Sequence, residues 1–553
     1  MLEPKDPDLL WIVIVGFIVA FVLAFGIGAN DVANSFGTSV GAKVLTLRQA
    51  CIIATIFELS GAVLIGARVS DTVRKGIIDI NSFNGTEELA MIGSLSALSG
   101  TGIWLIVATF FNLPVSGTHS VVGATMGYAL VAHGLAGVKW KTFGLIAASW
   151  VISPLLSGLS SSIIFVLIRH FILSKINAFD IGLKSLPLFY AITIAINFFS
   201  VFYKGSHVLG FDRIPLYGVL ILSVGGGILS AIIVLFVVSP YLKKKILREV
   251  YGDERETTLS AGSPAAAHFS KSTLIKSIEP EVFTDEQGSR KFLEESSQCE
   301  DDTVTLTLPS ECSVSTQAQD TPNNEQAPDT PSDEQNLSCS PSSEMQCDTK
   351  ELIQENGGLN EAHKERARSR GMSLLMEARM QVTDEPKTGR LFAFLQILTA
   401  SFGAFAHGGN DVSNAIGPLI SLWVIYWSGM IQEKVQIPIW ILVFGGVGIC
   451  IGLFVWGRRV IKTVGEDLTP ITPSSGFVIE IGSALTVLCA SNLGIPISTT
   501  HCKVGSVVMV GRVRSKEVVD WSLFRNVILA WVITMPFAGL ISAGLFAALR
   551  EAL

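Results

Sequence analysis

Two copies of an Asn-Asp motif carry the residues of this chain that are best suited to bind ions. Residues 28–38 read GANDVANSFGT, and residues 408–418 read GGNDVSNAIGP. An ionised carboxylate in apolar sequence is costly unless it is paired, solvated or bound to a cation. Carboxylate and amide oxygens are also the ligands that hard cations prefer. The motifs therefore predict cation sites built from Asn30, Asp31, Asn34, Asn410, Asp411 and Asn414.

A second duplicated motif follows a proline in each half of the chain. Residues 111–124 read FNLPVSGTHSVVGA, and residues 492–506 read NLGIPISTTHCKVGS. A proline suits the start of a half-helix, and the amino terminus of a helix attracts anions through its N–H groups and its dipole. Neutral hydroxyls add donors without a permanent charge. The motif therefore predicts an anion site formed by Ser116, Gly117, Thr118, Ser498, Thr499 and Thr500.

Each of these residues also has a purely structural interpretation. Small and polar residues pack membrane helices closely in many proteins. We favour an ion site because both motifs occur twice. Glu58 and Glu480 lie in apolar runs, and the cost of burying them favours a role in transport over that of satisfied structural acids. For His119 and His501 we favour packing, or hydrogen bonding around the site, over base catalysis.

The composition places the chain among polytopic membrane proteins. Its mean hydropathy is +0.50, with 49% hydrophobic and 16% charged residues among 553. This is too apolar for an ordinary soluble enzyme. The formal charge of −7 reflects a central acidic segment, and no basic footprint for nucleic acid is present. The amino-terminal apolar run is predicted to be the first spanning helix rather than a signal peptide.

We predict an all-α membrane protein of about twelve hydrophobic helices, in two inverted repeats with discontinuous helices and re-entrant hairpins. The two halves are residues 1–240 and 390–553. The glycine-rich Asn-Asp motifs are expected to unwind their helices. The predicted apolar segments are 10–27, 48–68, 92–111, 121–135, 143–168, 186–203, 216–239, 415–427, 438–456, 476–491, 499–512 and 523–549.

Residues 241–389 are predicted to be a disordered cytoplasmic linker. The segment is rich in Ser, Thr, Glu, Asp, Gln and Pro, so it cannot bury enough apolar surface to fold. A basic cluster of three lysines and Arg248 lies at its start, next to the preceding apolar run, which marks the cytoplasmic side. Cytoplasmic regulators are candidate partners of this loop. Asn84 begins an Asn-Gly-Thr sequon, which predicts a glycosylation site outside the cell.

The duplicated sequences GANDVANSFGT, GGNDVSNAIGP, PVSGTH and PISTTH resemble the signatures of the inorganic phosphate transporter (PiT) family. The long central loop resembles that of its eukaryotic sodium-dependent symporters. The resemblance covers residues 10–240 and 390–550 and implies phosphate as substrate, sodium as the coupling ion, extracellular termini and a plasma-membrane location.

The resemblance also implies roles for individual residues. Asn30 and Asn410 join the Ser/Thr motifs as phosphate ligands. Asp31, Asn34, Asp411 and Asn414, with Ser116 and Ser498, become sodium ligands, while Glu58 and Glu480 become essential acids. Ser94 departs from the pattern, because some animal members have Glu there, which puts the role of an acid at this position in doubt.

The resulting prediction is a symporter that moves phosphate into the cell with sodium by alternating access. It is not an enzyme and needs no cofactor beyond co-transported sodium. Alternatives are a proton-coupled phosphate or sulfate permease of the same fold, and a phosphate sensor or surface receptor. A homodimer is also considered.

Overall fold

The protein is described from a computed structural model. It covers residues 2–31, 33–203, 209–261, 382–432, 435–457, 460, 467–515 and 518–551. All regular elements in this part of the chain are helices, which confirms the all-α prediction. The α-helices are α1 (Leu10–Asp31), α2 (Ala33–Gly41), α3 (Leu47–Lys75), α4 (Glu87–Phe110), α5 (Gly117–His133), α6 (Trp140–Ile168), α7 (Ala178–Phe202), α8 (Leu216–Ile233), α9 (Ser239–Ala261), α13 (Pro386–Ser428), α14 (Ile439–Trp456), α16 (Pro473–Leu493), α17 (Thr499–Arg514) and α18 (Trp521–Arg550).

Short 3₁₀ and π segments adjoin several of these helices. The 3₁₀ helices are η1 (Pro7–Leu9), η2 (Ile80–Phe83), η3 (Gly134–Gly137) and η5 (Phe211–Arg213), and the π-helices are η4 (Arg169–Leu173) and η6 (Val234–Val238). Eleven helical segments in the described part are long and apolar enough to cross a membrane. α17 is not among them, because its 16 residues are too few to cross about 30 Å of hydrocarbon alone.

The prediction that the Asn-Asp motif unwinds its helix is wrong for the second copy. Helix α13 is continuous from Pro386 to Ser428 and carries the whole motif, including Pro418. The predicted span 415–427 is therefore only the last part of this 43-residue helix. In the first copy the chain is helical up to Asp31 and again from Ala33, and Val32 lies outside the described residues.

The glycines of this motif serve packing instead of unwinding. A Cβ atom on Gly408 would lie 2.2 Å from the carbonyl oxygen of Glu58, and one on Gly61 would lie 2.0 Å from that of Phe405. Backbones can approach this closely only where glycine leaves room, as small residues do between membrane helices. The crossing of α3 and α13 brings Glu58 next to the second Asn-Asp motif.

Helices from the two predicted halves pack against each other. The main pairs are α3 with α13, α5 with α18, α6 with α17 and α1 with α14. Apart from the last five residues of α9, 257–261, the described residues belong to one compact unit, Met1–Glu256 with Ser369–Leu553. Whether the halves are inverted repeats stays a prediction.

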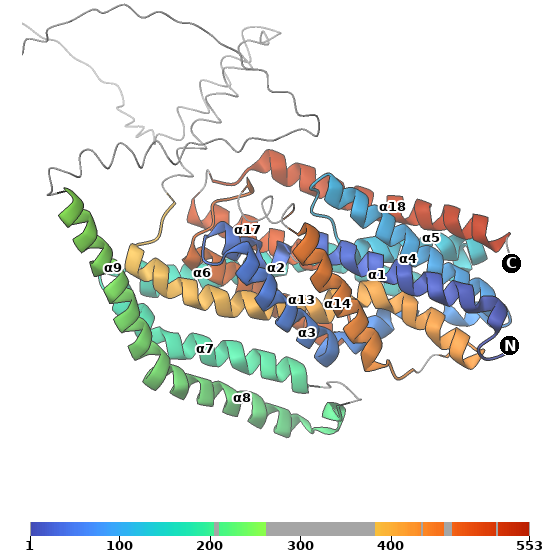
Figure 1. The fold of residues 1–553 in the computed structure, drawn as a ribbon, viewed down its shortest axis with the longest axis horizontal. Helices are drawn as coiled ribbons and strands as arrows, with labels where there is room; N and C mark the ends of the chain where they lie inside the picture. The colour runs from blue at the N-terminus through green and yellow to red at the C-terminus, as the bar shows by residue number, and fades with distance from the viewer. Residues whose placement is uncertain are drawn as a thin grey trace, which may run out of the picture. The chain divides into compact units, whose positions relative to one another are not determined.

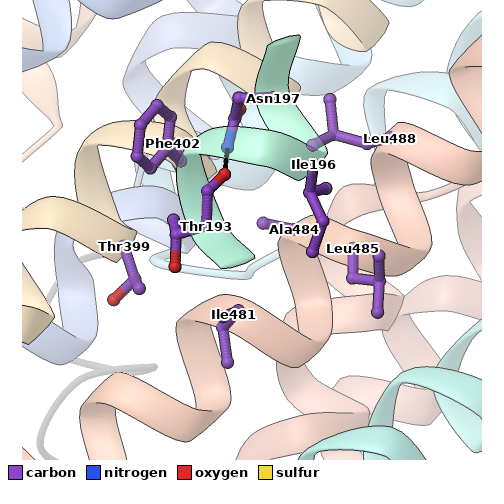
Figure 2. Close-up of a pocket in the computed structure, with 9 residues that line it drawn as sticks. All are labelled: Thr193, Ile196, Asn197, Thr399, Phe402, Ile481, Ala484, Leu485 and Leu488. Carbon is purple, nitrogen blue, oxygen red and sulfur yellow. Dashed lines mark hydrogen bonds between the residues drawn. The ribbon is translucent and has the colours of Figure 1, made fainter. Parts of the chain in front are cut away.

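Helices α7 and α8 pack on each other, and α7 also contacts α13 and α16 (Figure 1). Figure 2 shows a pocket between α7, α13 and α16, in which Asn197 donates to the carbonyl oxygen of Thr193 at 2.8 Å. None of the residues that line it belongs to the duplicated motifs.

The boundaries of the predicted linker, 241–389, are wrong at both ends. Helix α9 continues to Ala261, and α13 already begins at Pro386. Charged residues therefore extend a helix beyond the predicted end of the apolar run. Residues 262–381, most of the predicted linker, lie outside the described residues.

Two short non-helical segments, here called tips, connect α4 to α5 and α16 to α17. The first tip spans 111–116 and the second 494–498. Asn112 has φ 56° and Gly494 has φ 72°, so a left-handed residue begins the reversal in each tip. The following helix is capped by serine rather than started by proline, because Ser116 and Ser498 accept from the N–H groups of His119 and His501 at 3.2 and 3.1 Å.

Candidate functional site

The two tips meet each other through reciprocal hydrogen bonds. The hydroxyl of Thr118 donates to the carbonyl oxygen of Ile497 at 3.1 Å. The hydroxyl of Thr500 donates to the carbonyl oxygen of Val115 at 3.2 Å. The amino termini of α5 and α17, which carry the two predicted anion-binding motifs, therefore lie side by side.

The asparagines of the two Asn-Asp motifs hold these tips in place. Asn30 accepts from the N–H of Val115 at 3.1 Å and donates to the carbonyl oxygen of Leu113 at 2.9 Å. Asn410 donates to the carbonyl oxygen of Ile497 at 2.9 Å. Each motif thus fixes the tip of its own half. Both amide groups bond the protein backbone in this structure.

Asp31 joins the two tips. It accepts from the N–H of Gly117 at 3.2 Å and from the hydroxyl of Thr500 at 3.1 Å. Its side chain is buried, so an ion bound to this carboxylate would be kept away from lipid. One carboxylate therefore contacts the first turn of both α5 and α17.

Asp411 lies beside Asp31 in a cluster that could hold a cation. Ligand atoms of Asp31, His407 and Asp411 all lie within 4.8 Å of one another. Asn414 donates to Asp411 at 2.7 Å and to the hydroxyl of Thr118 at 3.2 Å. Oxygen ligands from both predicted motifs are thus concentrated in one buried place. Asn34 belongs to α2, and its side chain is outside the described residues.

Glu58 reaches this cluster through His407, which the sequence analysis missed. The Nδ1 atom of His407 lies 3.0 and 2.9 Å from the two carboxylate oxygens of Glu58. Its Nε2 atom lies 3.3 Å from Asp411. His407 precedes Asp411 by one helical turn, so the pattern His-x-x-x-Asp within an apolar helix could have revealed it.

Glu480 has a different partner, Lys503, which the sequence analysis also missed. The Nζ atom of Lys503 lies 2.5 Å from one carboxylate oxygen of Glu480, and the hydroxyl of Thr38 donates to the other. All three side chains are buried. A lysine within the apolar second motif was a sufficient signal, since charges are rare in such segments.

A small cavity separates this pair from the cation cluster. It is lined by Ser35, Gly403, His407, Ser483, Ala484, Val487, Thr499 and Lys503. The predicted anion ligand Thr499 therefore faces the same space as His407 and Lys503.

The histidines after the two tips take part in a stack of rings. His119 lies 4.4 Å from His501, centroid to centroid, and 4.0 Å from Trp150. His501 lies 3.6 Å from Trp531 and also contacts the hydroxyl of Ser498. These contacts agree with a packing role for both histidines.

Two predicted or noted positions lie away from the tips. Asn84 is exposed in the connection between η2 and α4, as a glycosylation acceptor must be. Ser94 is buried in α4 and donates to the carbonyl oxygen of Ala90 at 2.9 Å, so it satisfies its hydroxyl within its own helix.

The geometry combines the two chemistries that the motifs predicted. Helix amino termini and hydroxyl donors suit an anion, whereas the neighbouring carboxylates and amide oxygens suit cations. In a buried site of this kind, a bound cation would lower the cost of placing an anion beside it. A membrane protein with this site belongs to the class of ion-coupled transporters.

Comparison with known proteins identifies the family. Residues 27–542 match the model of the phosphate transporter family. Sodium-dependent phosphate transporter 1 of Homo sapiens is 43% identical to this chain, covering 98% of it and 96% of its own length. Sodium-dependent phosphate transporter 1-A of Danio rerio is also 43% identical, over 98% and 95%. The chain belongs to the phosphate transporter family.

A solved structure supports the same assignment. The protein titled "The sodium-dependent phosphate transporter" superposes with a TM-score of 0.67 and is 30% identical. The match covers 98% of this chain and all of the other. The family resemblance stated from the duplicated motifs is thereby confirmed.

Proposed function

We propose that this protein is a secondary active symporter that moves inorganic phosphate into the cell together with sodium. The relatives named above are sodium-dependent phosphate transporters, and they match along nearly the whole chain. The observation that carries the proposal is the meeting of two helix amino termini beside two buried aspartates.

Phosphate binds between the tips, against the first turns of α5 and α17. Its proposed ligands are Ser116, Gly117, Thr118, Ser498, Thr499, Thr500, Asn30 and Asn410. The hydroxyls of Thr118 and Thr500 bond the opposite tip in this structure. Phosphate therefore enters by exchanging these protein–protein hydrogen bonds for bonds to its own oxygens. That exchange requires the tips to separate.

Sodium binds beside the anion, with Asp31 and Asp411 as the charged ligands and Asn34, Asn414, Ser116 and Ser498 as neutral ones. Without sodium the two carboxylates would repel an incoming phosphate. With sodium bound the anion meets a neutralised site, and this makes uptake depend on both ions. Glu58 and Glu480 are the further acids on which transport depends.

Alternating access follows from relative movement of the two hairpins around this site, with the halves arranged as inverted repeats. We place the transporter in the plasma membrane, with Asn84 glycosylated outside and the central loop in the cytoplasm. The exposed sequon and the basic residues at the start of the loop support this orientation. A homodimer and regulators of the loop are further proposals.

The test is uptake of radiolabelled phosphate into proteoliposomes under an imposed sodium gradient. We expect accumulation that collapses when a sodium ionophore removes the gradient. A proton gradient alone should not drive uptake, and excess sulfate should not compete. Proton-driven or sulfate-sensitive uptake would instead support the alternative permeases, and absence of any flux would support a sensor. Empty liposomes and Asp31→Asn protein serve as controls.

A further inference from the structure

The buried pair of Glu480 and Lys503 does not belong to the cluster of Asp31, His407 and Asp411. The Lys503 side chain is 4% exposed and that of Glu480 is 0% exposed, and their charged atoms are 2.5 Å apart. A full ion pair in a membrane helix bundle is rare, and such residues are usually functional.

The carboxylate of Glu480 lies where several helices meet. Glu480 is in α16, Lys503 is in α17, and Thr38 donates to the carboxylate from α2. On α13, a Cβ atom on Gly403 would lie 2.9 Å from the same carboxylate. The pair therefore connects the second hairpin to the helices that carry both Asn-Asp motifs.

Lys503 also has a defined position relative to the ion site. It follows Thr499 and Thr500 by one helical turn on α17. Thr500 contacts Asp31, while Thr499, Lys503 and His407 line one cavity. A shift of Lys503 would move the first turn of α17, where the anion is proposed to bind.

The first half has no matching charge. When His119 is aligned with His501, the position of Lys503 falls on Val121. The lysine is therefore not part of the duplicated anion site. It is an addition to the second hairpin.

We infer that Lys503 is a positioning residue whose ammonium group acts as a built-in cation for Glu480. It occupies the place that a sodium ion would otherwise take beside this carboxylate. It also fixes α17 against α16 and, through the Glu480 carboxylate, against α2. Glu480 is then required because Lys503 is present and not because it binds sodium. This inference rests on the proposed function, since it assigns a role within sodium-coupled transport.

The physical basis is the difference between breaking a buried ion pair and removing it. Loss of one partner leaves an uncompensated buried charge, which is strongly unfavourable, whereas replacing both partners with neutral groups of similar size is often tolerated. The two single changes also leave charges of opposite sign. A lone carboxylate attracts sodium from solution, while a lone ammonium repels it.

The experiment measures phosphate uptake against sodium concentration for Lys503→Met, Glu480→Gln and the double variant in proteoliposomes. At moderate sodium, Lys503→Met should reduce uptake by about tenfold or more. High sodium should restore it, with a steeper sodium dependence. Glu480→Gln should reduce uptake similarly, with no recovery at high sodium. The double variant should return to within about threefold of the unaltered protein.

Lys503→Arg keeps the charge and should retain more uptake than Lys503→Met. A matched control is Arg74→Met, which removes another buried cation, paired with Asp71 at 2.9 Å near the end of α3. It should lower the yield of folded protein without altering the sodium dependence. A merely structural role for Lys503 would produce the same pattern as this control.

Several results would overturn the inference. These are unchanged sodium dependence in Lys503→Met, or a double variant no more active than either single one. If the single variants do not fold, the uptake and sodium dependence of the double variant still decide the question. Absence of sodium-driven uptake in the unaltered protein would instead refute the proposed function, and it is measured in the same series.

Discussion

Glu58 and Glu480 are both buried acids in apolar helices, yet their surroundings differ. Glu58 contacts His407, and the other ring nitrogen of this histidine faces Asp411. Glu480 contacts Lys503, an ammonium group, and Thr38. The first acid is therefore linked to the cation cluster through a shared ring, whereas the second is satisfied by a charge that belongs to the protein.

The difference shows that burial of an acid alone does not define its role. Because His407 connects Glu58 with Asp411, a change at Glu58 should alter how the cluster binds cations. Because Lys503 neutralises Glu480, a change at Glu480 should alter the position of α17.

The largest effect is expected for Asp411→Asn. This change removes the carboxylate that lies close to Asp31 and faces the His407 ring bonded to Glu58. Hydrogen bonds or ligand contacts to a charged group contribute roughly 1.5–3 kcal/mol each. Sodium-driven uptake should therefore fall by about a hundredfold. Radiolabelled uptake, normalised to protein in the liposomes, measures this. Asp180→Asn, at a partly exposed ion pair, is the control, and normal uptake by Asp411→Asn would remove this acid from the sodium site.

Glu58→Gln should have a smaller effect, because Asp411 remains and the amide oxygen can still accept from His407. The ring loses the charge that orients it, and partners behind a ligand typically change affinity by about ten- to a hundredfold. We expect the sodium concentration for half-maximal uptake to rise by about tenfold. High sodium should then restore the rate. A lower maximal rate with unchanged sodium dependence would contradict the link through His407.

Gly408→Ala tests the close packing of α13 against the backbone of α3 at Glu58. The new methyl group would lie 2.2 Å from the carbonyl oxygen of Glu58, so α3 and α13 must move apart. Overpacking of this kind costs about 1–3 kcal/mol. We expect a lower thermal unfolding temperature of purified protein and a several-fold loss of uptake. Unchanged stability would mean that the two helices are less tightly packed than the structure has them.

Gly403→Ala makes the corresponding change next to Glu480 and should have the smallest effect. Its methyl group would meet a carboxylate oxygen of Glu480 at 2.9 Å, which is the end of a side chain and not backbone. A shift of a few tenths of an ångström relieves the contact, so uptake should stay within about twofold of normal. Loss as large as that of Gly408→Ala would show that Lys503 and Thr38 hold the carboxylate immovably.

The sequence was sufficient to predict the helical fold, the family and the residues that meet at the tips. Duplication was the decisive signal, since Asn-Asp and Pro-x-Ser motifs at nearly constant spacing indicate two related halves. Composition then assigned the chain to the membrane, because few soluble folds tolerate so apolar a sequence.

Contacts between distant helices could not be predicted in this way. The glycines of the second Asn-Asp motif indicated unwound backbone, but close packing of α13 against α3 keeps this stretch helical. The sequence predicts the hydroxyls of Thr118 and Thr500 as donors to an anion, and in this structure they bond the opposite tip instead. Local pattern could have singled out His407 and Lys503 as unusual residues in apolar helices. Their pairing with Glu58 and Glu480 could not be predicted, because it depends on tertiary structure.

The packing of helices between the two halves has a consequence for biosynthesis. Helices α1, α3 and α5 find their main partners in α14, α13 and α18, which the ribosome makes only after the central segment. Synthesis of residues 241–385 takes roughly seven to thirty seconds at about 5–20 residues per second. During this interval the inserted first half exposes the glycine-rich and acidic faces that later become its interior. We therefore expect these faces of the nascent chain to need shielding from lipid and from neighbouring chains until its second half is made.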